Sequence, residues 1–430
     1  RRIGGCPAWT GGAMTTTGSR FGAQCEAVGP LADRFAAGGQ RLYLVGGIVR
    51  DVLSGRVEDH RDFDLTTDAP PDRIRSLIEG VVDAVWLQGE KFGTIGARLG
   101  ERMFEITTHR AEAYLSDSRK PVVSFSTQLE DDLLRRDFTV NAMAVDVVDG
   151  TLHDPLGGQA DLEARVLRTP LTPEESFSDD PLRMLRAARF LAGFDLAPAP
   201  GLVEAARTVS ERLRIVSAER IRDELWRLLV LEDPGVGLTF LEETGQLPMF
   251  LPEVSELSAL ERAEVFGRVV AAGPVPEVRL AALLMDVSAP VLEERLRWLR
   301  LSGGQRAMVL GLAAAVGLIR GRSDEAWSDE AVRRLTAVAG EYLAGAVVLA
   351  GLAGPATGVL EKRLADLRAD GDLDDLGPAL GGVQVIELLG LEPGPDVGEA
   401  MAWLAELRLS EGRLEPDEAG RRLVDWWEGR

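Results

Sequence analysis

The pattern of hydrophobic and polar positions divides this chain into two parts. Before about residue 165, short runs that alternate between apolar and polar residues, or are wholly apolar, predict strands between short helices. After about residue 170 the alternation disappears, and apolar positions recur at the spacing of amphipathic helices. The pattern therefore predicts an α/β head with a small mixed sheet, followed by an all-α remainder.

Five strands and several short helices are expected in the head. Residues 111–127 are polar and rich in turn-forming residues, which predicts a mobile loop. Strands are predicted at 42–45, 63–67, 94–99 and 102–108, helices at 31–37, 48–53 and 71–78, and a helix followed by a strand within 137–148. In the remainder, helices are predicted at 181–192, 201–212, 218–231, 236–244, 258–271, 278–285, 291–299, 304–319, 329–352, 358–369, 383–389, 397–407 and 416–427.

Charge and composition change this picture little. The chain has 430 residues, of which 45% are hydrophobic and 27% charged, as in ordinary globular proteins. The net charge of −21 argues against a nucleic-acid binder, but residues 361–430 alone carry 17 acidic and 8 basic residues, a net of −9. A basic surface elsewhere is therefore compatible with the total. No apolar run approaches the roughly 18 residues of a membrane span, so no membrane partner is expected.

The cysteines and the N-terminus bear on location. Cys6 and Cys25 are the only cysteines, so no disulfide framework is expected and a reducing cytoplasm fits. Residues 1–13 are glycine-rich and lack an apolar signal core, and Met14 is a candidate start. We therefore expect residues 1–27 to form a disordered N-terminal extension.

Gly46 and Gly47 stand where a predicted strand ends and a helix begins. Residues without a side chain let a triphosphate approach main-chain N–H groups near a helix N-terminus. A purely structural Gly-Gly turn has the same sequence, so the pair alone is weak evidence. It gains weight from Asp62 and Asp64, which follow on the next predicted strand.

Asp62 and Asp64 are two residues apart on that strand, so their side chains share a face while Phe63 points to the core. Adjacent carboxylates repel each other unless a cation lies between them, and Mg²⁺ prefers such hard oxygen ligands. Two ions can activate an attacking hydroxyl and stabilise a leaving pyrophosphate. A solvated, Asp-rich turn is the alternative. Glu105, between apolar strand neighbours, is a candidate third carboxylate or an ordinary solvent-facing residue.

Two arginine-bearing segments could supply cations for a phosphate. Arg136 lies in a densely charged run before an apolar stretch, which is also typical of a capped, solvated helix start. Further on, Asp180 caps a helix on which Arg183, Arg186 and Arg189 recur every third residue along one broad face. A solvated basic face is the usual interpretation, but a carboxylate beside a guanidinium can also present acceptors and donors to a nucleobase edge.

Together these segments resemble the class II nucleotidyltransferases, the family of bacterial CCA-adding tRNA nucleotidyltransferases and poly(A) polymerases. The resemblance covers about residues 28–255. It rests on GGIVRDVLSGR (46–56), RDFDLTT (61–67), GTIGARLGERMFEITTHR (93–110), DDLLRRDFTVNAMAVD (131–146), HDPLGG (153–158), DDPLRMLRAARF (179–190), SAERIRDELWRLL (217–229) and FLEETGQLPMFLPEV (240–254).

The resemblance implies an activity and a set of site residues. It implies template-independent addition of nucleotides from CTP and ATP to the 3′-hydroxyl of tRNA, with Mg²⁺ as the cofactor. Asp62 and Asp64 would be the Mg²⁺ ligands, and Glu105 a third catalytic carboxylate. The implied nucleotide contacts are Gly46, Gly47, Arg50 and Arg136 for the triphosphate, Asp180 and Arg183 for the base, and Arg186 and Arg189 as further contacts.

The family's fold is seahorse-like, with a head, a neck, a body and a tail. Transferred to this chain, it implies a catalytic nucleotidyltransferase head at 28–165 and a helical neck at 166–235 that binds the nucleotide base and RNA. It also implies a helical body at 236–345 and an acidic helical tail at 346–430.

The helical part departs from many relatives, which carry a metal-dependent phosphohydrolase domain with a His-Asp ligand pair. Here residues 280–287 read LAALLMDV, with Met285-Asp286 at that place. The histidines of the chain are His60, His109 and His153, all in the head. A histidine-ligated site in the C-terminal half is therefore excluded, and we interpret the region as a decayed remnant that serves as scaffold.

The remaining choice is among related activities. Residues 110–127 resemble the family's full-length flexible loop, including the RKP element at 119–121, which favours a CCA-adding or A-adding enzyme. The acidic tail argues against a poly(A) polymerase. We therefore predict a CCA-adding tRNA nucleotidyltransferase, with A-only addition or poly(A) synthesis as alternatives and a catalytically silent RNA-binding paralogue as a further one. The sequence leaves the oligomeric state open.

Overall fold

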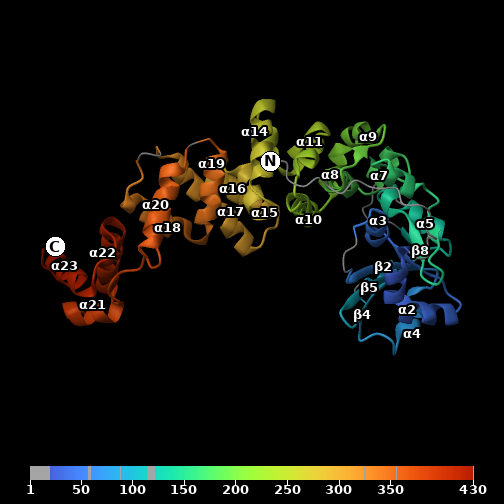
Figure 1. Ribbon diagram of the computed structural model, residues 1–430, viewed down its shortest axis with the longest axis horizontal. Helices are drawn as coiled ribbons and strands as arrows, with labels where there is room; N and C mark the ends of the chain where they lie inside the picture. The colour runs from blue at the N-terminus through green and yellow to red at the C-terminus, as the bar shows by residue number, and fades with distance from the viewer. Residues whose placement is uncertain are drawn as a thin grey trace. The chain divides into compact units, whose positions relative to one another are not determined.

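The structure, a computed structural model, describes residues 20–56, 60–87, 89–113, 122–323, 326–354 and 356–429. The chain forms two compact units. One runs to Val216 and includes Phe240–Gln246, and the other comprises Ser217–Thr239 and Leu247–Arg430. Within the described residues, every strand lies in the first unit, and the second contains helices alone (Figure 1). The predicted α/β head followed by an all-helical remainder is confirmed.

The head is built on a mixed sheet of seven strands in the order β3-β4-β5-β2-β1-β8-β9. The central pair, β2 and β5, is parallel, and its neighbours are antiparallel. The strands are β1 (Leu42–Val45), β2 (Asp62–Thr67), β3 (Ala84–Trp86), β4 (Thr94–Leu99), β5 (Arg102–Thr108), β8 (Ala144–Asp146) and β9 (Leu152–His153).

One face of this sheet is covered by α2 (Gly22–Ala37) and α4 (Pro71–Ile78). The alternating pattern of the strands places Phe63 and Phe104 on that face, where their rings stack with centroids 5.3 Å apart. Each is at most 3% exposed. Burial of such a side chain is worth about 1.5–3 kcal/mol, so the covered face holds β2 and β5 in register.

The opposite face is covered only in part. There Tyr43 and Val45 of β1 pack against Leu129 and Leu133 of α5 (Leu129–Leu134). The helix α3 (Gly47–Leu53) follows β1 directly and contacts both β1 and β2. The part of this face over β2, β5, β4 and β3 carries polar residues and a pocket, described below.

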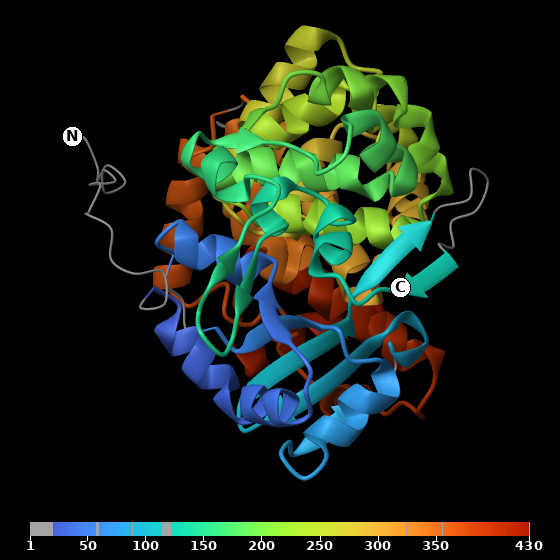
Figure 2. The ribbon, with the colours of Figure 1, turned by 90° about the vertical axis from the view of Figure 1, so that its right-hand side faces the viewer.

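A two-stranded hairpin stands apart from the main sheet, as Figure 2 shows for the two cyan and teal arrows. It pairs β6 (Arg110–Ala113) with β7 (Val122–Phe125) in antiparallel fashion. The residues that join its strands, including the RKP element at 119–121, lie outside the described residues. The described ends of the segment predicted as a loop are therefore strands.

Short helices complete the first unit. A capping box between Thr172 and Glu175 fixes the start of α7, and Asp180 at its end precedes the next helix. These elements are α6 (Gly158–Glu163), α7 (Pro173–Asp179), α8 (Leu182–Phe194), α9 (Leu202–Thr208), and the two-residue strands β10 (Val166–Leu167) and β11 (Ala197–Pro198), with 3-10 turns at Glu90–Phe92, Thr139–Asn141 and Ser210–Ile215.

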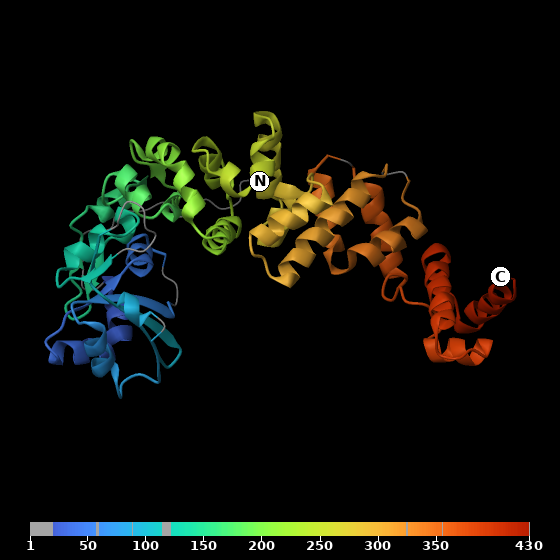
Figure 3. The same ribbon diagram turned by 180° about the vertical axis from the view of Figure 1, so that it is seen from behind.

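The second unit contains helices joined by short turns (Figure 3). Its last three helices share a small apolar core of their own, built around Val385, Leu404 and Leu423. The helices are α10 (Ala218–Leu229), α11 (Gly235–Glu243), which crosses the division between units, α12 (Leu247–Phe250), α13 (Pro252–Ser255), α14 (Ala259–Ala271), α15 (Pro276–Leu284), α16 (Ala289–Trp298), α17 (Gly303–Arg320), α18 (Asp329–Ala339), α19 (Leu343–Leu352), α20 (Gly358–Ala369), α21 (Gly382–Leu389), α22 (Pro395–Glu411) and α23 (Pro416–Glu428).

Several local expectations are wrong. The first helix begins at Gly22 rather than at residue 31, because Ala27 and Val28 already pack in the core, so the expected extension 1–27 overlaps it. A single 3-10 turn replaces the helix expected within 137–148. A strand also occurs after residue 170, where β11 pairs with β10. The finer division into head, neck, body and tail stays a proposal.

The expectation that no apolar run approaches the length of a membrane span is wrong for one stretch. By length and composition alone, Asp329–Leu352 is apolar enough to cross a membrane, and 39% of its most apolar window is buried. It is not one helix, because Gly340 adopts φ +51° and separates α18 from α19. Both segments pack against α17. These contacts are those of helices in a protein core.

Candidate active site

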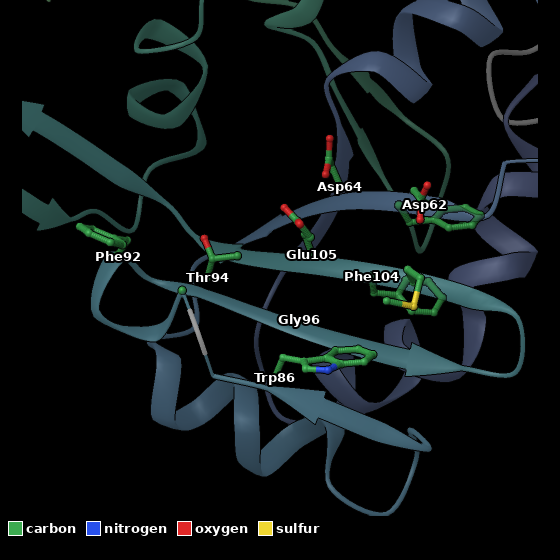
Figure 4. A pocket seen from close by; sticks show the side chains of 11 residues that line it. Asp62, Asp64, Trp86, Phe92, Thr94, Gly96, Phe104 and Glu105 are labelled. Carbon is green, nitrogen blue, oxygen red and sulfur yellow. The ribbon is translucent and has the colours of Figure 1, made fainter. Parts of the chain in front are cut away.

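Three carboxylates lie on the open face of the sheet. Asp62 and Asp64 alternate with the buried Phe63 along β2, and Glu105 alternates with buried neighbours along β5. Because β2 and β5 are parallel and in register, the Cα of Asp64 is paired with that of Glu105. Figure 4 shows the two carboxyl groups on the same side of the sheet, with Asp62 farther along the same strand. The prediction that Asp62 and Asp64 share one face is confirmed, and Glu105 lies on that face as well.

The negative charges of Asp62, Asp64 and Glu105 are only partly balanced by nearby positive charge. Burial raises the pKa of Asp64, Asp62 raises it further, and Arg136 opposes both. Burial also raises the pKa of Glu105, followed by the charges of Asp64 and Asp62. Among the described residues no ion pair neutralises Asp62 or Glu105. A divalent cation would relieve this repulsion.

The donor set fits a hard cation through Asp62 and Asp64. Carboxylate oxygens are the ligands that Mg²⁺ takes when it keeps water and phosphate oxygens in its remaining positions. Within the described part of the chain, no group of three or more His, Cys, Asp or Glu is arranged as a complete metal cage. Two carboxylates would leave coordination positions of such a cation for water and for a substrate.

The glycine turn reaches this carboxylate group. Gly46 adopts φ +75°, a left-handed value that favours glycine. A Cβ added there would lie 3.4 Å from Nη1 of Arg136 and 3.5 Å from Oδ2 of Asp64. A Cβ on Gly47 would lie 3.5 Å from Nη2 of Arg50. The turn, a carboxylate and two guanidinium groups therefore converge, an arrangement that the family resemblance implied and the spacing of the motifs did not.

Arg136 is held beside Asp64 by a second acid. Its Nη2 donates to Oδ2 of Asp132 at 3.0 Å, and Arg135 occupies Oδ1 of the same carboxylate at 2.9 Å. Burial alone would raise the pKa of Asp132, but the two arginines hold it at about 2. The buried Nε of Arg136 has no partner among the described residues. Nη1 of Arg136 faces the glycine turn, so a fixed cation lies next to it, as an anion site requires.

Arg50 has an internal role in this structure. It is 8% exposed, and it donates to Asp51 at 2.8 and 2.9 Å and to Oδ1 of Asn141 at 2.7 Å. The face of its guanidinium lies 4.0 Å from the ring centroid of Phe194. Arg50 therefore links α3 to the 3-10 turn and to α8. These contacts hold its guanidinium next to the glycine turn.

The arginines of α8 do not form one solvated face. Arg183 is 6% exposed and donates to Oγ of Ser176 at 2.9 Å and to the carbonyl oxygen of Arg135. Arg186 pairs with Asp137 at 2.5 Å. Burial alone would raise the pKa of Asp137, but Arg186 and its hydrogen bonds hold it at about 2. Arg183 and Arg186 thus join α8 to the segment that carries Arg136.

Arg189 and Asp180, the other two predicted nucleotide contacts in this region, lie on α8 and just before it. The guanidinium of Arg189 lies 4.7 Å from the ring centroid of Phe190, on the same helix. Asp180 turns its Oδ1 back to accept the backbone N–H of Leu182 at 3.1 Å, and its own carbonyl accepts the N–H of Arg183. The structure therefore brings Asp180 and Arg183 together at the start of α8, in the same unit as the carboxylates.

The carboxylates open into a pocket of about 600 Å³. Part of its lining lies on the predicted strands β4 and β5, but the edge strand β3, which carries Trp86, was not predicted. The apolar run Ala84–Leu87 before Gly89 was the available signal. Figure 4 shows these walls, and the lining residues are Asp62, Phe63, Asp64, Trp86, Gly89, Phe92, Thr94, Gly96, Met103, Phe104 and Glu105.

The helical unit offers no comparable site at Asp286. Its carboxylate pairs with Arg268 at 2.9 Å and with Arg320. Burial alone would raise the pKa of Asp286, but these two arginines lower it. A carboxylate fixed between two cations is a poor metal ligand, which supports the interpretation of this region as scaffold.

Comparison with known proteins agrees with this geometry. The family of poly(A) polymerase head domains matches residues 42–168, and the family described as a probable RNA and SrmB-binding site of polymerase A matches residues 193–257. A CCA-adding enzyme of Geobacillus thermodenitrificans is 33% identical over 401 residues, which cover 90% of this chain and 93% of that enzyme.

Shorter matches and a solved structure give the same family. A CCA-adding enzyme of Levilactobacillus brevis is 38% identical over 232 residues, 54% of this chain and 56% of that enzyme. The chain thus spans about half the length of several curated relatives that it matches. The crystal structure of the Bacillus stearothermophilus CCA-adding enzyme in complex with CTP has a TM-score of 0.74 and 28% identity, and the match covers 97% of this chain and 99% of that one.

Proposed function

This chain belongs to the CCA-adding enzyme family, and on that premise we propose that it is a tRNA nucleotidyltransferase that adds the 3′-terminal CCA to tRNA from CTP and ATP. The observation that carries the proposal is the pairing of Asp64 with Glu105 beside Asp62, the Gly46 turn and Arg136. This set combines a site for cations with a site for a triphosphate. A sheet that only bound RNA would have no need to gather carboxylates, which repel phosphates.

The proposed reaction is an in-line attack of the tRNA 3′-hydroxyl on the α-phosphate of the nucleotide. Divalent ions, when bound, supply charge stabilisation for the attacking and leaving oxygens, and Mg²⁺ is the ion we propose. Asp62 and Asp64 would hold them, and Glu105 would complete the acidic group. The 3′-hydroxyl loses its proton to solvent as its oxygen bonds to the α-phosphorus, the bond from the α-phosphorus to the oxygen that bridges to the β-phosphate breaks, and pyrophosphate leaves.

The basic side of the site is proposed to hold the triphosphate. Gly46 and Gly47 let the phosphates approach the backbone, and Arg136 directs its Nη1 to the same turn. The contacts of Arg50 support a role in holding that turn, with any phosphate contact made from its buried position. Positioning of this kind is the main source of catalysis in phosphoryl transfer.

The start of α8 is proposed to choose the nucleotide. Asp180 and Arg183 would present an acceptor and donors to the edge of the base, with Arg186 and Arg189 as neighbouring contacts. The bond of Arg183 to Ser176 supports a fixed orientation of its guanidinium. A reducing cytoplasm is the proposed location, and it suits Cys25, the free cysteine among the described residues.

One experiment tests the function and separates it from addition of A alone. The purified full chain is offered tRNA that ends at the discriminator base, and tRNA that ends in CC, each with labelled CTP or ATP. A CCA-adding enzyme extends the first with CTP and the second with ATP. Extension of only the CC-ended tRNA would indicate an A-adding enzyme, and long A tails a poly(A) polymerase. No extension with intact tRNA binding would indicate a silent paralogue.

A further inference from the structure

A tryptophan on the edge strand stands in register with the carboxylates. Trp86 of β3 is paired with Gly96 of β4, Gly96 with Glu105 of β5, and Glu105 with Asp64 of β2. Residues paired in this way across neighbouring strands share one face of the sheet. With strands about 4.8 Å apart, Trp86 lies two strand spacings, or about 10 Å, from Glu105.

The glycine in this row lets the indole lie over the sheet. A Cβ added at Gly96 would lie 3.3 Å from Cε3 and 3.5 Å from Cβ of Trp86. Figure 4 shows the indole alongside β4, in the pocket that also contains Glu105. Trp86 is 42% exposed and Met103 beside it 37%. A large aromatic face left open inside a pocket of acids is unusual for a residue with only a packing role.

The order of the strands indicates which substrate would contact the indole of Trp86. Different groups lie on the two sides of Asp64. On the β1 side are the glycine turn and Arg136, and on the β5 side are Glu105 and then Trp86. In-line transfer needs the leaving and attacking oxygens on opposite sides of the phosphorus. If the pyrophosphate leaves on the β1 side, the RNA 3′-hydroxyl enters from the β5 side.

We propose, on the basis of the proposed function, that Trp86 is a stacking platform for the base of the RNA 3′-terminal nucleotide. The ribose of that terminal nucleotide then lies over Glu105, and its 3′-hydroxyl is directed to Asp64. Stacking on an aromatic ring accepts any base, because every base has a π-face. That tolerance suits an enzyme that must extend its own product, whose last base is the discriminator base before the first addition and C before the later ones. Trp86 is thus a positioning residue for the acceptor RNA.

The test compares Trp86→Ala, Trp86→Phe and wild type in steady-state addition of CTP and ATP. Stacking on one base is worth enough to change affinity by about fivefold or more. Trp86→Ala should raise the KM for tRNA by at least that factor, leave the KM for CTP and ATP within about twofold, and recover in Trp86→Phe. Val148→Ala removes apolar surface elsewhere on the same unit, at a residue 69% exposed, and should change neither KM.

A change in the RNA provides a second, independent measurement. Acceptor RNA whose 3′-terminal nucleotide lacks its base should bind wild type at least about fivefold more weakly than intact RNA. The Trp86→Ala variant should bind the RNA that lacks its terminal base and the intact RNA with equal affinity. If Trp86→Ala does not fold, the wild-type comparison and Trp86→Phe still decide the point.

The outcomes separate this inference from the proposed function. A wild-type protein that adds neither CTP nor ATP to tRNA overturns the function itself. Normal addition by wild type with an unchanged tRNA KM in Trp86→Ala overturns only the platform. A raised KM for CTP or ATP in place of tRNA also overturns it, because the indole would then contact the incoming nucleotide.

Discussion

Asp64 and Glu105 are directly paired across the parallel strands β2 and β5. The residues that precede them, Phe63 and Phe104, stack on the covered face with ring centroids 5.3 Å apart. The aromatic pair therefore packs β2 against β5 on the core side, while the register of the two strands pairs the carboxylates. The acids are held together by the fold before any cation binds, so part of the cost of assembling the site is met during folding.

This arrangement predicts opposite effects of Asp64→Asn with and without divalent ions. In chelator, the neutral amide removes repulsion from Asp62 and Glu105, so the variant should melt above wild type, by about 2–4 °C for each kcal/mol relieved. With Mg²⁺ present, only wild type should gain stability by binding. CTP addition should fall about a thousandfold or more, because metal stabilisation of the transition state is worth several kcal/mol.

Melting curves by circular dichroism, in chelator and in Mg²⁺, check this prediction. The control is Glu101→Gln, the same chemical change at a carboxylate that pairs with Arg61 in solvent. That variant should behave as wild type in both conditions. If Mg²⁺ stabilises Asp64→Asn as much as wild type, the assignment of Asp64 as a ligand is wrong.

Arg136 and Arg135 provide a matched pair, because both donate to Asp132. Only Arg136 approaches Gly46 and Asp64. Arg136→Gln should raise the KM for CTP and ATP about tenfold or more, the value of a charge-assisted hydrogen bond. Arg135→Gln should cost similar stability and leave both KM values within about twofold. Equal effects of the two substitutions on KM would assign the loss to Asp132 and not to a phosphate contact.

Arg50 should act on stability more than on nucleotide binding. Arg50→Lys keeps the charge but cannot bond to Asp51 and Asn141 while it lies flat on Phe194. We expect the free energy of unfolding in urea to fall by about 2–4 kcal/mol. Arg56→Lys is the control, because Arg56 also lies over Phe194, at 4.5 Å, but is exposed. A raised nucleotide KM without loss of stability would restore the direct phosphate role of Arg50.

The sequence predicted those parts of the fold and site that depend on local pattern. Alternation along β2 places Asp62 and Asp64 on one face whatever the rest of the chain does. The Gly46 turn is equally local, because the residue that follows the strand needs a positive φ. The motif resemblance supplied the partnership between these segments, since spacing alone does not say which strands are neighbours.

The parts that the sequence could not predict depend on register between distant segments. The pairing of Trp86 with Gly96 follows from which strand forms the edge, and the short run of β3 has no distinctive periodicity. Likewise, the helical spacing of Arg183 and Arg186 suggested a solvated face. Their orientation is set by Asp137 and Ser176, which belong to other elements. The periodicity of one helix cannot predict ion pairs that its arginines make with residues on other elements.

Base selection should depend on Asp180 but not on its neighbour. Asp180→Ala removes the acceptor at the start of α8, so we expect the preference for CTP and ATP over UTP and GTP to fall at least about tenfold. The overall rate should fall less than in Asp64→Asn. Asp179→Ala removes the adjacent carboxylate, at the last residue of α7, and should keep the preference. Ratios of kcat/KM for the four nucleotides measure this, and equal loss in both variants would contradict the role of Asp180.

Asp286 should contribute to stability in a pH-dependent way and should not contribute to addition. Arg268 and Arg320 lower the pKa of its carboxylate below the ordinary value of 3.8 despite burial. A lowered pKa means that the folded state favours the charged form, so this stabilisation is present at neutral pH. It is lost as the pH falls through the ordinary value toward the lower one.

Asp286→Asn should therefore unfold more easily than wild type at pH 7, by at most about 1 kcal/mol because the carboxylate is partly exposed. The difference should shrink as the pH falls below about 4, where the wild-type carboxylate also becomes protonated. CTP and ATP addition should be unchanged at pH 7. A decayed metal site predicts no stabilisation of wild type over the variant by Mn²⁺ or Zn²⁺. If either ion stabilises wild type alone, Asp286 still binds metal despite its two arginine partners, and the helical unit retains a site of its own.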